Sequence, residues 1–572
     1  MKTDSLNYLS KIIFSLLSIS SLSPVTAQNL YEWTWVSGFN TSNPIAEYGT
    51  KGRGSINNTP GGREKSISWT DKKGNFWIYG GDEGYNGTTI GIFNDLWKFS
   101  PKNNQWTWIS GGKKINQSVI YGEKNVGSAS NSPGSRREGA SWVDKSGNLW
   151  LFGGWGYKKK KQGDFNDLWK FDITTNEWTW INGDSVQNKI ANYGTKGKAS
   201  LKSKPGARWG AISWVDKSNN LWMFGGFGFS QKDSGDDFLN DLWKYDIDNN
   251  KWTWVSGDSI SSVSSIYGIK NVSSPTNRPG SRIESASCID ANGNLWMFGG
   301  SGLGAGTHNS LLNDLWKYDI SSKQWTWVSG DSLTDSYGVY GTKQVESSGN
   351  KIGARTSSAM WVDKNGIFWI FGGYGYGYIT YGFLNDLWNY NSSTKNWTWY
   401  NGSNAGNSLG HYGTKGVGSP SNTPGGRNFF CRFSDTTGNI WIFGGNGESA
   451  TGYGLLNDLW KIKVSNTSVN QADASLNHIT NFKENIEKNI INLEINPNPV
   501  SDKLNLKIYC KNNDKINLEI IDINGRVFYS KKDMIISGAN TISLPINFLS
   551  SDVYFLRITS KNDMAILKWI KQ

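Results

Sequence analysis

Histidine and cysteine are scarce in this chain, with three residues of each among 572. His308, His411 and His478 are far apart in the sequence, and zinc-type spacings, a Gly-x-Ser-x-Gly motif and phosphate-binding glycine loops are missing. The sequence therefore predicts no metal and no cofactor, and it gives little sign of catalysis. A site assembled from distant loops would escape this kind of reading.

Long apolar runs and helical periodicity are lacking as well. The apolar stretch at 12–19, flanked by Lys2 and Lys11 and followed by the small side chains of Val25-Thr-Ala27, is too short to span a bilayer. We interpret residues 1–27 as a secretory signal peptide; a buried N-terminal strand is the alternative. No other segment reaches spanning length, so no transmembrane segment is expected in the mature chain.

One pattern is repeated six times instead, with a spacing of 72 to 74 residues. Its markers are Trp-Thr-Trp at 33–35, 106–108, 178–180, 252–254, 325–327 and 397–399; Gly-Gly at 80–81, 153–154, 225–226, 299–300, 372–373 and 444–445; and Asn-Asp-Leu-Trp at 94–97, 166–169, 240–243, 313–316, 385–388 and 457–460. An arginine and a Tyr-Gly pair keep the same period. Such a period predicts copies of one supersecondary unit, stacked or arranged around an axis.

Each repeat contains four short β-type segments separated by polar or glycine turns, as at 140–143, 149–152, 167–171 and 178–181. Four antiparallel strands of this kind form a propeller blade. The first Trp-Thr-Trp precedes any Gly-Gly, and the last repeat has none after Trp460. The N-terminal strand is therefore predicted to complete the sixth blade and close the ring, within one domain at 28–465.

The spacing of Gly-Gly, an aromatic residue and a tryptophan resembles the kelch motif. The aromatic residue and tryptophan pairs are Phe99 and Trp106, Phe171 and Trp178, Tyr245 and Trp252, Tyr318 and Trp325, and Tyr390 and Trp397. The resemblance implies an all-β, six-bladed kelch-type β-propeller. An additional Tyr-Gly-x-Lys segment in each blade is similar to bacterial kelch proteins related to the central domain of galactose oxidase. The two histidines, two tyrosines and cysteine thioether of that oxidase's copper site are not grouped in this sequence.

The C-terminal part has a different composition. Residues 466–493 are polar and rich in asparagine, which is typical of a linker, and residues 494–572 alternate as in a small β-sandwich. Three motifs there resemble the type A sorting domain of the type IX secretion system of Bacteroidetes: Asn496-Pro-Asn-Pro499, Asp522-Ile-Asn-Gly525-Arg526 and Ser551-Asp-Val-Tyr-Phe555. The resemblance implies Sec export and type IX translocation, with the protein secreted or attached to the outer surface and the secretion machinery as a partner of 494–572. A generic adhesive sandwich is the alternative.

The net charge of +12 does not indicate a nucleic-acid partner. The lysines are scattered among turns, no basic helix is predicted, and the export signals place the protein outside the cell. Acidic glycans or cell-surface anions fit this charge better.

The links between second and third strands and the links between blades are long, and strand direction places them on one face, which we predict to be the binding face. Each blade brings one arginine close to the central channel: Arg63, Arg136, Arg208, Arg282, Arg355 and Arg427. They equal in number the aspartates at 95, 167, 241, 314, 386 and 458. We interpret them as buried Arg–Asp or Arg–carbonyl clamps, because one ligand rarely has sixfold symmetry. A cationic ring that binds a polyanion is the alternative, so the arginines stay candidate binding residues.

Aromatic residues that are not repeated form the second group of candidates. They follow the Gly-Gly pairs, with Trp209 beside the third arginine: Tyr85, Trp155, Tyr157, Trp209, Phe227, Phe229, Tyr374, Tyr376, Tyr378 and Tyr381. Exposed aromatic faces between glycines suit stacking against sugar rings. The alternative is that they only cover the ends of the blades. The repeated lysines at 51, 124, 196, 270, 343 and 415 are expected to be exposed turn residues.

These observations predict an exported binding module for a glycan or a cell-surface protein, without catalysis. The alternative is a carbohydrate-active enzyme of the sialic-acid mutarotase kind, also a six-bladed kelch fold, with Glu64, Glu138 or Glu284 as acid and base. A carboxylate and an arginine converging in an open channel would favour the enzyme, and a channel plugged by repeated side chains would favour the binder. A third possibility is a structural adhesin without a small ligand. An acidic loop could bind calcium, although a solvated loop is the simpler expectation; its residues are Asp233, Asp236 and Asp237.

Overall fold

The computed structural model of the protein describes residues 31–85, 90–232, 235–464, 490–495, 503–522, 527–547, 549, 553–559 and 564–570. The predicted signal peptide lies outside these residues, and so does the predicted linker up to residue 489. The chain divides into two compact units between Asn466 and Thr467. Every regular element among the described residues is a β-strand, and none of these residues forms a helix that could cross a membrane.

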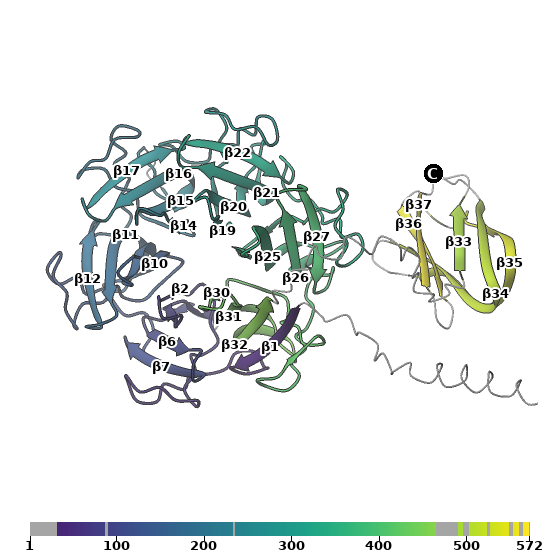
Figure 1. Ribbon diagram of the computed structural model, residues 1–572, viewed down its shortest axis with the longest axis horizontal. Helices are drawn as coiled ribbons and strands as arrows, with labels where there is room; N and C mark the ends of the chain where they lie inside the picture. Colours follow the sequence, from purple (N-terminus) through teal and green to yellow (C-terminus); the bar gives the residue numbers. More distant parts are fainter. Residues whose placement is uncertain are drawn as a thin grey trace, which may run out of the picture. The chain divides into compact units, whose positions relative to one another are not determined.

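In the first unit, six antiparallel sheets stand around a common centre, with the earliest strand of most blades innermost (Figure 1). Blade one contains β2 (Ile67–Thr70), β3 (Phe76–Tyr79), β6 (Leu96–Ser100) and β7 (Gln105–Ser110), and the hairpin of β4 (Asp82–Tyr85) and β5 (Ile90–Ile92) follows β3. Blade two contains β8 (Arg136–Arg137), β9 (Ala140–Val143), β10 (Leu149–Lys158), β11 (Lys161–Asp172) and β12 (Glu177–Asn182). Blade three contains β13 (Arg208–Trp209), β14 (Ile212–Val215), β15 (Leu221–Gly228), β16 (Asp237–Asp246) and β17 (Lys251–Ser256).

The remaining blades repeat this plan. Blade four contains β18 (Arg282–Ile283), β19 (Ala286–Ile289), β20 (Leu295–Leu303), β21 (Asn309–Asp319) and β22 (Gln324–Ser329). Blade five contains β23 (Arg355–Thr356), β24 (Ala359–Val362), β25 (Ile367–Tyr376), β26 (Tyr381–Asn391) and β27 (Asn396–Asn401). Blade six contains β29 (Arg427–Asn428), β30 (Cys431–Ser434), β31 (Ile440–Glu448), β32 (Tyr453–Val464) and β1 (Tyr31–Ser37), with β28 (Gly418–Ser419) beside β1.

The sixth blade takes its outer strand from the N-terminal part of the chain. Strand β1 pairs antiparallel with β32, with Trp33 opposite Ile462 and Trp35 opposite Trp460. This pairing confirms the predicted six-bladed, all-β propeller closed by an N-terminal strand. It also covers the edge of β32, whose backbone groups would otherwise be open to pairing with another chain.

Neighbouring blades are joined by a repeated aromatic contact. The first tryptophan of each Trp-Thr-Trp packs on an aromatic ring of the preceding blade, with ring centroids 5.0 to 5.8 Å apart. In blade two, for example, Trp178 packs on Tyr79, and Trp33 packs on Phe371 where the ring closes. Such pairs contribute about 0.5–1.5 kcal/mol each beyond the burial of their area. The repeated tryptophans therefore provide the aromatic packing between neighbouring blades.

Glycine is required at the Gly-Gly pairs because neighbouring blades approach each other closely at these positions. Gly80 has a φ of +63°, and a Cβ there would lie 2.3 Å from the backbone oxygen of Arg136 in the next blade. Both the left-handed conformation and the close backbone contact require glycine.

The second unit is a sheet of β33 (Ile490–Ile495), β34 (Lys503–Asp522), β35 (Val527–Pro545), β36 (Val553–Thr559) and β37 (Met564–Ile570). The register between β34 and β35 breaks between Cys510 and Asp514. Residues on both sides of this break, such as Leu506 and Leu518, pack in one buried cluster. The long strand therefore bends, and its two halves supply the two layers of the predicted β-sandwich.

Candidate functional site

The six repeated arginines form buried clamps. Each guanidinium binds the aspartate of its own blade at 2.5 to 2.8 Å, and the side chains of both are at most 1% exposed. Arg63 Nη1 also donates to the backbone oxygen of Gly80 at 3.2 Å. These contacts support the clamp interpretation. They leave no cationic ring open to a polyanion, because the guanidinium groups of Arg63, Arg136, Arg208, Arg282, Arg355 and Arg427 are enclosed by protein.

Each clamp aspartate accepts two further hydrogen bonds. The Tyr-Gly tyrosine donates its hydroxyl proton to the aspartate at 2.6 to 2.9 Å, and the tryptophan of Asn-Asp-Leu-Trp donates its indole proton at 2.7 to 2.8 Å. Burial, and after it the aspartate charge, raise the pKa of Tyr193 well above its ordinary value, so this phenol stays a donor. The clamp thus ties the long loop between blades to the sheet.

The repeated lysines are exposed, as expected, and their ammonium groups are nevertheless engaged by the protein. Each ammonium lies 4.2 to 4.5 Å from the centre of the second tryptophan of a Trp-Thr-Trp. It also donates to a glycine carbonyl at 2.6 to 3.2 Å. The Tyr-Gly-x-Lys segment therefore fastens a loop over the outer edge of a blade, and these lysines offer little to an acidic ligand.

In each blade the chain bends two residues after the clamp arginine. The residues at this bend are Lys65, Glu138, Gly210, Glu284, Ser357 and Phe429, all left-handed with φ between 52° and 68°. Their backbones join the blades in a ring: Glu138 N donates to Lys65 O, and Gly210 N to Glu138 O, at 2.9 to 3.1 Å. Because the backbone makes the ring, the side chains can differ from blade to blade. This ring, with the residues beside it, is here called the mouth of the channel.

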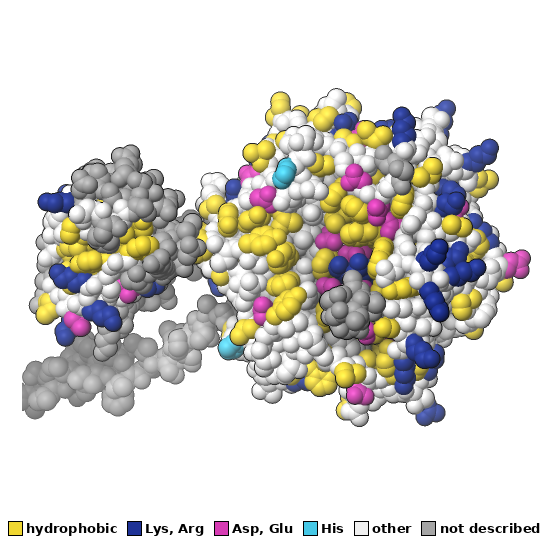
Figure 2. Space-filling model, turned by 180° about the vertical axis from the view of Figure 1, so that it is seen from behind, with side chains coloured by type: hydrophobic (Ala, Val, Ile, Leu, Met, Phe, Trp, Pro, Cys, Tyr) yellow, Lys and Arg dark blue, Asp and Glu magenta, His cyan; other side chains and the backbone are white. Residues whose placement is uncertain are grey.

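Seven charged side chains meet at the mouth, and none of them belongs to a clamp. Arg137 forms a salt bridge with Asp82 of blade one, and its Nε lies 3.7 Å from Glu138 Oε2. Lys65 interacts with Glu138 and Glu64, and Glu284 with Glu138. Asp164 is opposite Trp155 in the blade-two sheet and interacts with Arg137. Figure 2 shows acidic and basic side chains together near the middle of one face of the propeller, among hydrophobic ones.

The acidity of this mouth cluster is strongly shifted. Burial, opposed by Lys65, raises the pKa of Glu64 to about 7. Burial raises the pKa of Asp82 to about 6 in spite of Arg137, and burial together with Asp236 raises the pKa of Asp164 to about 7.

Within the mouth cluster, Glu284 is the carboxyl group best suited to donate a proton. Burial and then the neighbouring Glu138 raise its pKa, although Ser357 opposes the shift by donating a hydrogen bond to its Oε2 at 2.7 Å. Shifts of this kind, concentrated in one hollow, mark a functional site more often than a structural one.

Several buried atoms of the mouth have no hydrogen-bond partner among the described residues. They are Asp82 Oδ1, Asp164 Oδ2, Arg137 Nε and both carboxylate oxygens of Glu138. Asp82 and Asp164 are only 1% and 2% exposed. Buried polar groups are normally satisfied, so these atoms suit the hydroxyl groups of a ligand or its waters.

The structure brings part of the predicted aromatic set to this mouth. The guanidinium of Arg137 lies 4.5 Å from the ring centre of Trp155, and Trp209 lies 5.3 Å from Phe227. Tyr374, paired with Thr356 in blade five, lies 4.8 Å from Tyr381. All of these rings are at least partly exposed.

Other predicted aromatic residues do not present a face to a ligand there. Tyr157 and Phe229 are 8% exposed, so they cover the ends of their blades. Tyr376 packs on Tyr337 and Tyr381 within the hairpin of β25 and β26, and Tyr378 is 46% exposed at the tip of that hairpin. The side chain of Tyr85 is outside the described part of the chain.

Two aspartates of the predicted acidic loop lie among the described residues. Asp236 is exposed, Asp237 accepts a hydrogen bond from Ser262 Oγ at 2.6 Å, and Asp233 lies outside the described residues. Among the residues that the structure describes, no group of three or more acidic, histidine or cysteine side chains is placed to hold a metal.

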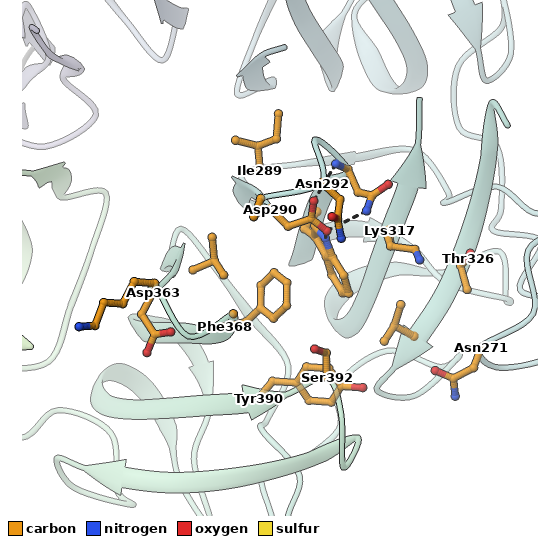
Figure 3. A pocket seen from close by; sticks show the side chains of 17 residues that line it. Asn271, Ile289, Asp290, Asn292, Lys317, Thr326, Asp363, Phe368, Tyr390 and Ser392 are labelled. Atoms are coloured by element: carbon orange, nitrogen blue, oxygen red, sulfur yellow. Dashed lines mark hydrogen bonds between the residues drawn. The ribbon is translucent and has the colours of Figure 1, made fainter. Parts of the chain in front are cut away.

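A second hollow of about 640 Å³ lies between blades four and five, with Asp290, Asp363 and Phe368 on its walls (Figure 3). Asp290 is fully engaged by its own turn, where Asn294 Nδ2 and Trp296 Nε1 donate to it at 2.8 Å. Equivalent turns occur in other blades, as at Asp71 and Asp144. This hollow is therefore part of the repeated frame.

Comparison with known proteins agrees with this architecture. Residues 57–255 and 123–332 match the KLHDC2/KLHL20/DRC7 Kelch-repeats domain, and residues 494–572 match the secretion system C-terminal sorting domain. A solved structure titled "Structure of YjhT" is 13% identical, covers 70% of this chain and 95% of its own, and has a TM-score of 0.40. A copper complex described as a novel fungal alcohol oxidase with catalytic diversity among the AA5 family is 11% identical, covers 92% and 100%, and has the same TM-score of 0.40. At these scores the two structures carry no argument about activity.

Proposed function

Because this chain is a kelch-repeat propeller protein whose sorting domain directs type IX secretion to the cell surface or the extracellular space, we propose that it binds a carbohydrate at the mouth of its channel. One observation carries the proposal: the mouth holds buried carboxylate oxygens without partners, beside aromatic rings that are partly exposed. Sugars match both features, since their hydroxyl groups donate to carboxylates and their ring faces stack on aromatic side chains.

The charge at the mouth narrows the class of glycan. Five carboxylates face two cations there, Lys65 and Arg137, so the mouth has an acidic excess although the whole chain has a net charge of +12. A neutral glycan suits this balance better than the acidic glycan suggested by net charge. A surface protein would reach the mouth only through a narrow projecting segment, so we favour the glycan.

Replacing Trp155 or Trp209 by alanine is expected to weaken glycan binding about tenfold, since loss of one stacking face removes roughly 1–1.5 kcal/mol. A glycan array probed with the full chain identifies the ligand, and titration calorimetry measures each variant. Phe39→Ala is the matched control, because Phe39 is an aromatic side chain 46% exposed in the loop after β1. Equal losses in all three variants, or binding to cells without binding to any glycan, would contradict the proposal and favour an adhesin.

A second candidate function is proton transfer on the bound sugar. It is favoured by Glu138 and Glu284, two adjacent carboxyl groups of which Glu284 has a raised pKa and Glu138 has oxygens without partners. Such a pair can remove the proton of an anomeric hydroxyl while protonating the ring oxygen, so that the ring bond breaks and an open-chain carbonyl forms without any redox partner.

Mutarotation of the sugar found on the array tests this candidate. Polarimetry or NMR exchange is expected to show faster interconversion of anomers with the protein, and Glu284→Gln is expected to abolish the acceleration while binding remains. Identical rates with and without the protein would exclude this function and leave the binding proposal intact.

A further inference from the structure

The hairpin that joins β10 to β11 in blade two consists of lysine alone at its tip. Lys158 ends β10 and Lys161 begins β11, and the two residues of the turn between them are lysines as well. The corresponding turns of blades five and six, at 377–380 and 449–452, contain no charged residue. The lysine run is therefore a feature of blade two and not of the repeat.

Two features of this hairpin oppose its stability. Lys159 and Lys160 have φ of 46° and 64°, and in the described part of the chain no other two adjacent non-glycine residues are both left-handed. A two-residue turn of this kind is most stable with Asn-Gly. Lys158 and Lys161 are directly opposite each other in the register, where like charges repel. Exposed side chains gain little from packing, so this combination of costs indicates residues kept for a function.

The loops on both sides of the hairpin extend its positive charge. The backbone nitrogen of Lys159 donates to Ser118 Oγ at 2.9 Å, and the ammonium of Lys158 donates to the backbone oxygen of Ser185. The hairpin therefore lies against both inter-blade loops beside blade two. These loops supply three further exposed lysines: Lys113, Lys114 and Lys189. Together with the four lysines of the hairpin, they are here called the lysine patch.

Acidic side chains do not neutralise the lysine patch. The hairpin and the loop segments at 111–119 and 183–190 contain two acidic residues, Asp164 and Asp184. Asp164 is 2% exposed and belongs to the mouth, and Asp184 forms a salt bridge with Lys204 at 2.6 Å. Among the side chains that the structure describes, no ion pair includes a lysine of the patch. In Figure 2, basic side chains gather on one side of the face whose middle is acidic.

The chemistry of the patch selects the class of its partner. The tip at 158–162 has neither an aromatic nor an apolar side chain. Single-stranded nucleic acids bind to aromatic stacking platforms, and a membrane or a protein partner is held by apolar side chains that insert or pack. An acidic polysaccharide needs neither, because flexible lysines act as point charges that can follow its repeated negative groups. The secretion of this chain brings it among such polymers outside the cell.

We propose that the lysine patch binds an acidic polysaccharide and retains the secreted protein on it. The proposal does not rest on the carbohydrate site. The mouth has an acidic excess and suits a neutral sugar, and no lysine of the patch belongs to the mouth cluster. The same face therefore carries two sites of opposite charge, one for a polymer and one for a sugar unit.

Binding of the full chain to immobilised polygalacturonate and dextran sulfate tests this proposal, with neutral dextran as the reference. The wild-type protein is expected to bind at least one of the two acidic polymers, not to bind dextran, and to bind more weakly as the salt concentration rises. The carboxylated and the sulfated polymer distinguish the two kinds of negative group.

Replacing Lys159 by asparagine and Lys160 by glycine installs the preferred turn and removes two charges. This double variant is expected to bind the acidic polymer about threefold to tenfold more weakly. Its melting temperature is expected to rise by about 1–3 °C, because the strain of the turn is relieved. Lys114→Gln with Lys189→Gln is a second patch variant, which leaves the hairpin unchanged and is expected to lose affinity as well.

Lys323→Asn with Lys395→Asn is the matched control. Both lysines are exposed and left-handed, at turns where three other blades have a left-handed asparagine: Asn104, Asn176 and Asn250. The control removes the same charge outside the patch, so its affinity for the polymer is expected to stay within about twofold of wild type. Trp209→Ala is also expected to keep this affinity, which separates a failure here from a failure of the carbohydrate site.

Three results would overturn the proposal. One is an equal loss of affinity in the patch variants and in the control, which would assign binding to net charge alone. Another is equal binding to dextran and to the acidic polymers. The third is tighter binding to phosphatidylglycerol vesicles than to either polymer, which would assign the patch to a membrane. If one patch variant fails to fold, the other decides.

Discussion

Replacing Asp241 by alanine is expected to lower the free energy of unfolding by about 3–5 kcal/mol, because a buried ion pair would lose one partner and leave the other charge uncompensated. Asp241 is fully buried and accepts hydrogen bonds from Arg208 at 2.5 and 2.8 Å, from Tyr193 at 2.7 Å and from Trp243 at 2.7 Å. The variant would leave a guanidinium, a phenol and an indole buried without their hydrogen-bond acceptor. Urea denaturation followed by tryptophan fluorescence measures the loss.

Two further variants separate the buried charge from general damage. Arg208→Met combined with Asp241→Leu is expected to be more stable than Asp241→Ala alone, because no charge is left unpaired. Lys351→Met removes the surface pair with Asp331, 2.9 Å apart and 34% exposed on both sides, and is expected to cost at most about 1 kcal/mol. A loss below about 1 kcal/mol for Asp241→Ala would contradict the role assigned to the clamps.

The repeat made the frame predictable from the sequence. Six in-phase copies fix the register of each blade, and a Trp-Thr-Trp ahead of the first Gly-Gly already indicated that β1 completes blade six. The equal numbers of arginines and aspartates likewise pointed to the clamps. A side chain that recurs in every blade has the same surroundings in each, so its role can be predicted once for all six blades.

The mouth was less predictable because a bend interrupts the alternation of the inner strands. Glu64, Glu138 and Glu284 were named from the sequence as possible acid and base residues, and the structure places them together. Their cations are Lys65 and Arg137 rather than a clamp arginine, because the left-handed bend changes which side chains face the channel. A prediction that assumes regular alternation along the inner strand misses this change in side-chain direction.

Two members of the mouth cluster were missed by sequence reasoning. Asp82 follows the first Gly-Gly, and Asp164 stands on the third strand of blade two, where blades three and five have Phe238 and Phe383. The sequence contained a signal for them, because each is an acidic residue at a position where several other blades have an aromatic one. The contacts of the exposed lysines with tryptophan could not be predicted either, since they depend on a loop that folds back over the blade.

Asp164→Asn is expected to make the protein more stable at pH 8 and weaker in glycan binding. Asp164 is 2% exposed, and burial, followed by Asp236, raises its pKa from 3.8 to about 7. Between these values the folded chain holds a proton that the unfolded chain has released, so stability falls as the pH rises through this window. Above pH 7 the full penalty of about 4 kcal/mol applies, as an upper bound at roughly 1.4 kcal/mol per unit.

Asparagine carries no charge and avoids this penalty. The variant is therefore expected to gain about 2–4 kcal/mol at pH 8, and the gain should shrink toward zero below about pH 3, where the aspartate is protonated in both states. Urea denaturation at several pH values measures this dependence. Asp172→Asn in the same blade is the control: hydrogen bonds from the Thr174 backbone lower the pKa of Asp172, so its replacement is expected to change stability in the opposite direction.

The same variant links stability to the proposed function. A carboxylate that costs stability and leaves Oδ2 without a partner is expected to gain its partner from the ligand, so Asp164→Asn should lose affinity for the glycan while the fold becomes more stable. A stabilised variant with unchanged affinity would remove Asp164 from the binding site. A gain in stability over the wild-type protein that is the same at pH 5 and pH 8 would refute the buried, ionisable environment itself.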